Sequence, residues 1–183
     1  MVEMSKYLSV LGMICATIML TGFFTPWLGM YSAPYEMEGV RVMDYVEVTG
    51  WDLSIGRIKV TQMRESQEYL RWEYYRTIEL QVESKSYPIL CLIGGIIFLI
   101  GGISALKLKN KVPFLSLLIG GALSFIGGAL GFLENRWIIP RAIVIEKYVI
   151  FGYYRSGLLL CTISSIICIF GCLFIWGFSR KNP

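Results

Sequence analysis

Four stretches of this chain contain no charged residue, and each is long enough to cross a lipid bilayer. They cover Tyr7–Met30, Ser86–Leu106, Val112–Leu133 and Ser156–Ser179. A hydrocarbon core of ~30 Å requires about 20 mainly apolar residues in a helix. The sequence therefore predicts an α-helical membrane protein, a four-transmembrane-helix bundle over 7–30, 86–106, 112–133 and 156–179. We expect the first stretch to be a retained signal-anchor helix, because it is longer than the apolar region of a cleaved signal peptide.

Basic residues are concentrated in the short segments that flank these stretches. Those segments hold one acid, Glu3, against the basic residues Lys6, Lys107, Lys109, Lys111, Arg180 and Lys181. The long segment 31–85 holds seven basic and ten acidic residues instead. Positive charge marks the cytoplasmic side of transmembrane helices. We therefore expect a multi-pass protein of the plasma membrane, with both termini cytoplasmic and two outward loops, 31–85 and 134–155.

Glycine doublets mark the second and third stretches. Ile-Gly-Gly occurs at 93–95 and 100–102, and again at 119–121 and 126–128. Glycine costs about 1 kcal/mol in a helix interior, but in a membrane small residues let helix backbones approach closely. The short linker 107–111 predicts an antiparallel hairpin whose glycine faces meet each other or the flanking helices. The predicted helix-packing glycines are Gly94, Gly95, Gly101, Gly102, Gly120, Gly121, Gly127 and Gly128.

Small side chains also line one face of the fourth stretch, where Gly157, Cys161, Ser164, Cys168 and Gly171 follow one another at helical spacing. We predict that Gly157, Cys161 and Cys168 pack against a neighbouring helix. The alternative is a soft-metal site, because thiolates bind Cu(I) and zinc. Packing is favoured, because the chain has no histidine and its helices contain no acid. We expect no metal, no cofactor and no disulfide in the outward loops.

The long loop changes from helical to alternating apolar periodicity, which indicates half-buried strands. The clearest alternation covers 70–82, with Arg76 as the one break in its apolar face, and shorter ones cover 40–48 and 58–60. A β-branched run at 143–150 in the second loop supplies a further candidate strand. The sequence therefore predicts a small antiparallel β-sheet outside the membrane, with one packed face and one wet face.

Two tryptophan motifs accompany this pattern. Pro26-Trp27 lies where the first helix is expected to leave the membrane, and Gly50-Trp51-Asp52-Leu53 follows the valine-rich strand. Trp51 is expected either to pack under the sheet or to reach the membrane interface. With its order of helix, β-rich loop and three further helices, the chain resembles the claudin-type tetraspan family, and bacterial and archaeal tetraspans with the same two motifs are similar. The likeness covers the whole topology but few motif residues, and the family's paired loop cysteines are absent.

No arrangement of residues in the sequence points to catalysis. Histidine is absent, which removes the usual general base near neutral pH. The carboxylates of segment 31–85 alternate with basic residues, which is typical of a solvated sheet face rather than a calcium site. No ionisable residue interrupts the four stretches, which argues against an ion pathway. We therefore expect a protein that is not an enzyme.

Three classes of function remain, in decreasing order of support. The first is an accessory or structural subunit of a larger membrane complex, and the second is a claudin-like adhesion or envelope-organising protein that self-associates. The third is a channel or transporter. The expected partners are membrane lipid, other membrane proteins or copies of the chain itself, and no nucleic acid. The resemblance implies an exposed sheet that contacts proteins, and the candidate contact residues are Trp51, Trp72, Tyr74 and Arg141.

Overall fold

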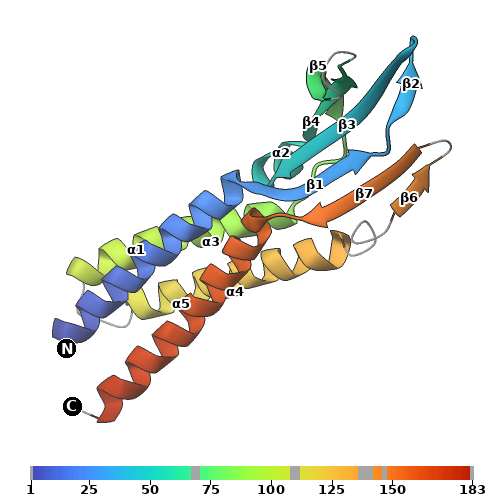
Figure 1. The fold of residues 1–183 in the computed structure, drawn as a ribbon. Coiled ribbons are helices and arrows are strands. Elements are labelled where there is room, and N and C mark those ends of the chain that lie inside the picture. The colour runs from blue at the N-terminus through green and yellow to red at the C-terminus, as the bar shows by residue number, and fades with distance from the viewer. Residues whose placement is uncertain (1, 67–70, 108–111, 136–141, 146–147, 182–183) are drawn as a thin grey trace.

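The computed structural model describes residues 2–66, 71–107, 112–135, 142–145 and 148–181. Four helices in this part of the chain are long and apolar enough to cross a membrane. They are α1 (Val2–Phe24), α3 (Tyr87–Lys107), α4 (Val112–Asn135) and α5 (Ser156–Lys181). Helix α1 packs on α3 and α5, and α4 packs on the same two helices, so the four form a closed bundle. Both termini lie at the end of this bundle that is remote from the sheet (Figure 1).

The glycine doublets divide their contacts between two neighbours. A β-carbon on Gly94 or Gly101 would meet α4, and one on Gly95 or Gly102 would meet α1. The first and second glycines of the α4 doublets face α3 and α5 in the same way. The first glycine of each doublet therefore faces the other helix of the α3–α4 hairpin, and the second faces a flanking helix.

Helix α1 is shorter than expected at its C-terminal end. The sequence predicts a helix over 7–30, but the structure ends α1 at Phe24 and places Pro26–Ser32 in strand β1. Proline lacks an N–H and disfavours helical geometry in the residue before it. The strand that follows is itself apolar and uncharged. Hydropathy alone therefore could not separate the end of the helix from the strand.

Seven antiparallel strands form one sheet in the described residues, in the order β5-β4-β3-β1-β7-β6, with β2 paired to β3. They are β1 (Pro26–Ser32), β2 (Tyr35–Met37), β3 (Val40–Thr49), β4 (Arg57–Glu65), β5 (Trp72–Gln81), β6 (Ala142–Ile145) and β7 (Tyr148–Tyr154). The alternations at 40–48, 58–60 and 70–82 fall on β3, β4 and β5, although Leu70 lies outside the described residues. The run at 143–150 belongs to the hairpin β6–β7. Strands β1 and β2 were not predicted.

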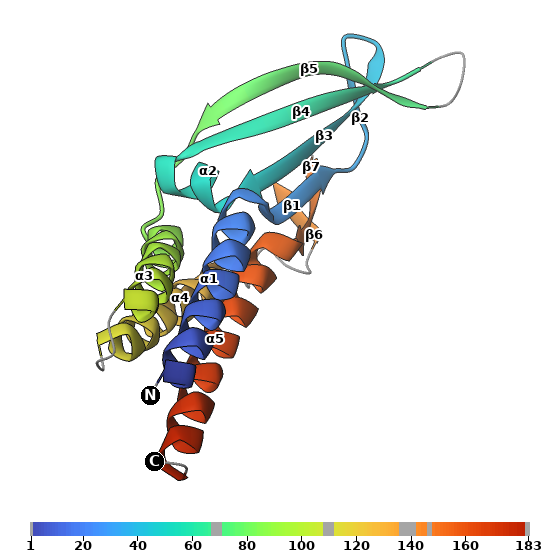
Figure 2. The same ribbon diagram turned by 90° about the vertical axis from the view of Figure 1, so that its left-hand side faces the viewer.

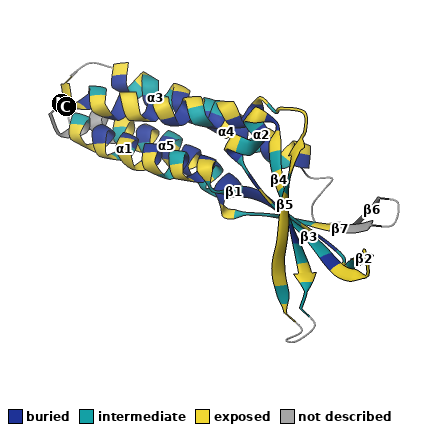
Figure 3. Cartoon of the chain, turned by 90° about the horizontal axis from the view of Figure 1, so that it is seen from above, coloured by how far each residue is buried: buried dark blue, intermediate teal, exposed yellow. Residues whose placement is uncertain are grey.

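The bundle and the sheet share one buried core at their junction. Trp27 at the start of β1 is fully buried, and its indole N–H donates to the Gly22 carbonyl at 2.9 Å. Leu28 and Val48 from the sheet lie in the same cluster as Leu158 from α5. The short helix α2 (Gly50–Ile55) contacts α1, α3, β3 and β4 and lies between the sheet and the bundle (Figure 2). Burial fades toward β5, which is mostly exposed (Figure 3).

Candidate functional site

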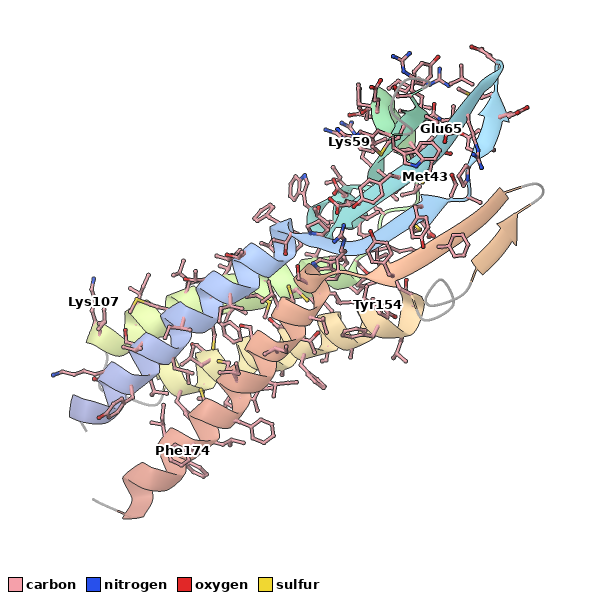
Figure 4. The ribbon with its side chains drawn as sticks, in the orientation of Figure 1. Met43, Lys59, Glu65, Lys107, Tyr154 and Phe174 are labelled. Atoms are coloured by element: carbon pink, nitrogen blue, oxygen red, sulfur yellow. The ribbon has the colours of Figure 1, made fainter. Side chains whose placement is uncertain are left out.

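The contact residues predicted from the sequence do not form a single site. Trp51 lies on α2 beside Phe24, whereas Trp72 and Tyr74 lie on β5. The β4–β5 register pairs Trp72 with Glu65 (labelled in Figure 4). This pair lies at the opposite end of the hairpin from Arg57, which follows α2. Trp51 is thus separated from the other two along the length of β5. Arg141 lies outside the described residues.

The small residues of α5 lie in helix contacts. A β-carbon on Gly157 would meet the Thr25 and Gly22 carbonyls, and Cys161 and Cys168 are fully buried. Their thiols donate to the Met19 and Leu117 carbonyls at 3.6 Å. Among the described residues, no group of three or more histidine, cysteine or acidic side chains is placed to hold a metal ion.

The sheet carries an aromatic face that sequence reasoning missed. It consists of Tyr31 on β1, Tyr45 on β3, and Phe151 and Tyr153 on β7. The strand register places Tyr31 directly between Tyr45 and Phe151. The Tyr31 and Phe151 rings stack with centroids 5.1 Å apart, and Tyr153 is 6.2 Å from Tyr31. About two fifths of Tyr31 is exposed (40%) and slightly less of Phe151 (37%), so a partner can reach these rings.

Gly29 allows the aromatic face to close over β1. The register pairs Gly29 with both Glu47 and Tyr153. A β-carbon on Gly29 would overlap the Tyr153 ring, so this ring lies across the strand where a side chain would otherwise stand. The ring thereby extends toward β3, next to the polar groups of Tyr45 and Glu47.

A charged pair borders the aromatic face. The Arg155 guanidinium donates to the Tyr45 hydroxyl at 2.6 Å and pairs with the Glu47 carboxylate at 2.5 Å, and it lies 5.0 Å from the Tyr153 ring centroid. The Tyr45 hydroxyl donates to Glu47 in turn. Burial, followed by the hydrogen bond to Glu47, raises the pKa of Tyr45, and the hydrogen bond to Tyr45 raises the pKa of Arg155. Tyr45 therefore stays neutral and Arg155 stays charged at physiological pH.

A polar network on the opposite face explains the break at Arg76. Gln62 is nearly buried (5% exposed) and donates to Asp44 at 2.8 Å and to the Tyr35 hydroxyl at 3.0 Å. Arg76 donates to the Gln62 side-chain oxygen at 2.5 Å, and the Asp44 amide donates to Ser32. These groups satisfy one another, so the network ties β5 to the middle of the sheet.

The aromatic face combines exposed rings with a guanidinium–carboxylate pair at its border. Exposed tyrosine rings next to an arginine are the side chains most often enriched in protein interfaces. Comparison with protein-family models and with curated proteins finds no match to this chain.

Part of the signal for this face was present in the sequence. Phe151, Tyr153 and Arg155 alternate with other residues, as side chains on one face of a strand do. The predicted strand at 143–150 ended before them, and the expected helix over 7–30 concealed β1. The pairing of β1 with β7 joins segments far apart in the chain, and no local pattern reports it.

Proposed function

We propose that this chain is a non-catalytic multi-pass membrane protein that acts as an accessory subunit of a larger membrane complex. Its four long apolar helices cross the plasma membrane with both termini in the cytoplasm, and the sheet projects from the outer surface. We place the sheet outside the membrane because basic residues are concentrated near both termini, which marks that end of the bundle as cytoplasmic. The claudin-type likeness belongs to the same proposal, as a shared arrangement of bundle and sheet.

The observation that carries the proposal is the aromatic face with its Arg155–Glu47 pair. Exposed aromatic rings that stack on one another lose little side-chain entropy when a partner covers them, because they are already held in place. An arginine and a carboxylate at the border add directional contacts. The face thus combines rigid apolar area with a polar rim, as protein interfaces do.

The test is purification of the tagged chain from native membranes in mild detergent, with native mass spectrometry of the intact assembly. We expect a defined hetero-complex that is lost in the double variant Tyr31→Ser, Phe151→Ser. The matched control is Tyr75→Ser, which removes an exposed tyrosine from β5 and should leave the complex intact. A lone monomer or a homo-oligomer from wild-type membranes would contradict the accessory role.

Self-association is the second candidate, and the outer edge of β5 favours it. In the described residues β5 pairs only with β4, and most of its side chains are exposed. A long free strand edge is a template for pairing with another chain. Proline cannot donate to such a ladder, so Thr77→Pro should abolish chemical cross-linking between copies on apposed vesicles. Cross-linking that survives this substitution would exclude pairing through the β5 edge.

A further inference from the structure

Helix α2 presents an apolar surface that neither the sheet nor the bundle covers. Trp51 and Ile55 stand one helical turn apart on this helix, and they are 46% and 42% exposed. Phe24, the last residue of α1, lies next to Trp51 and is 58% exposed. The Trp51 ring centroid lies 6.3 Å from that of Phe24 and 6.5 Å from that of the fully buried Phe23.

The outward direction of these side chains is imposed by the way α2 is anchored. Thr49 and Asp52 form a reciprocal capping box at its start, with hydrogen bonds of 2.9 and 3.1 Å. Gly56 ends the helix in the left-handed conformation (φ 69°), which glycine adopts without strain. Leu53 is buried on the inner side, and its carbonyl accepts from the Lys85 amide at 2.8 Å. With Leu53 inward, Trp51 and Ile55 are held on the outer side.

This surface continues the exposed side of a membrane-spanning helix. Val10, Ile14 and Phe24 are all exposed on α1, and with Thr17 and Thr21 they follow the alternating four- and three-residue spacing of one helix face. Phe24 ends this row, and Trp51 covers its end. The surroundings of this row on α1 therefore extend to Trp51, and Ile55 lies one helical turn farther along α2. For a helix that crosses a bilayer, the surroundings of such a row are acyl chains, with headgroups at its end.

We propose that α2 is an interfacial helix, with Trp51, Ile55 and Phe24 inserted at the boundary between the acyl chains and the headgroups of the membrane that α1 crosses. Tryptophan is enriched at this depth, and a helix with one apolar face can lie in the interface plane. The inference rests on the membrane-spanning part of the proposed function and is independent of any protein partner. Contact with the lipid would hold the β3–β4 connection against the bilayer surface.

Spin labels placed on single introduced cysteines test the proposal in phosphatidylcholine vesicles. The five native cysteines are buried, so labelling is directed to the new position. Ile55→Cys carries the test label, Ile14→Cys provides the lipid reference on α1, and Tyr74→Cys provides the water reference on β5. We expect position 55 to collide with oxygen several-fold more, relative to a water-soluble nickel chelate, than position 74 does.

Each of the other possible outcomes contradicts either the interfacial position of α2 or the membrane-spanning role of the chain. If position 14 reports lipid but position 55 is as accessible to nickel as position 74, α2 lies in water and this inference fails alone. Low collision rates with both reagents at position 55 would mean that protein covers α2, which also overturns it. If position 14 reports water, the membrane-spanning role fails as well.

Tryptophan fluorescence in vesicles of lipid brominated near the carbonyl gives a second measurement. We expect the bromine atoms to quench the fluorescence of Trp51. Trp51→Phe should therefore remove a quenched component of the fluorescence, and Trp72→Phe should leave that component in place.

Discussion

The bundle and the sheet are stabilised by different kinds of contact. In the bundle the helices meet through glycines, so that at Gly12 and Gly102 the backbones of α1 and α3 are adjacent. In the sheet the strands are joined by backbone ladders and by rows of side chains such as Tyr31, Tyr45 and Phe151. Apolar side chains gain nothing from leaving lipid, so close shape fitting holds helices together there. The sheet relies on strand register and cross-strand pairs.

The first prediction concerns a variant that overfills a close backbone contact between α1 and α3. A β-carbon on Gly12 would lie 2.8 Å from the Gly102 Cα, and a backbone atom cannot move aside as a side chain can. Overpacking usually costs about 1–3 kcal/mol, and four added carbons against backbone should exceed this. We expect Gly12→Leu to prevent assembly of the bundle, as measured by thermal unfolding in detergent. Gly177→Leu is the control, because in the described part of the chain no atom beyond the adjacent turns of its own helix lies within 4 Å of its β-carbon position. Equal stability of the two variants would contradict the contact.

The second prediction concerns the stability that the junction between the bundle and the sheet provides. Trp27 is fully buried, and truncating such a side chain to alanine costs about 3–5 kcal/mol. We expect Trp27→Ala to lower the free energy of unfolding by this amount in a denaturant titration. Trp51→Ala, at a half-exposed tryptophan, should cost far less. Similar losses for the two variants would show that the junction is no more important than the surface of α2.

The third prediction concerns a substitution that should destabilise the sheet and leave the bundle unchanged. Gln62→Ala removes the hydrogen bonds that Gln62 makes with Asp44 and Arg76, and a hydrogen bond to a charged group contributes about 1.5–3 kcal/mol. Hydrogen exchange followed by mass spectrometry should speed up in β3 and β4 but not in α3 or α4. Gln81→Ala, at an exposed position on β5, is the control. Unchanged exchange in β3 and β4 would mean that the network adds no stability.

The smallest expected effect concerns pH and the Tyr45 hydroxyl. Its pKa is raised in the folded protein by burial and by Glu47, so the unfolded chain releases this proton first, near pH ~10. Stability from this source is complete below that pH and falls as the pH rises above it, because the unfolded state then binds fewer protons. The free energy of unfolding should therefore decline more steeply with alkali in the wild type than in Tyr45→Phe. Tyr74→Phe serves as the control, and identical slopes for wild type and Tyr45→Phe would contradict the prediction.

The sequence predicted the bundle better than it predicted the sheet, for a physical reason. A few consecutive residues are enough to indicate the role of a glycine doublet such as Gly94-Gly95. Glycine destabilises a helix interior, and only close packing compensates for that free-energy cost. The aromatic face depends on β1 meeting both β3 and β7, and such register is set by pairing between distant segments. The sequence predicts Trp51 as a contact residue, whereas its neighbour Phe24 falls in the interior of the predicted helix over 7–30. The missed end of α1 therefore hid both β1 and the surface around α2.

One connection in the fold has a mechanical consequence. Only Thr25 separates α1 from β1, and only Arg155 separates β7 from α5. These two strands pair with each other, and the Arg155 amide donates to the Trp27 carbonyl at 2.9 Å across the joint. Two neighbouring helices thus continue into two neighbouring strands without a flexible linker between helix and strand. A force on the aromatic face is therefore transmitted to α1 and α5, so the sheet and these two helices tilt together as one rigid body.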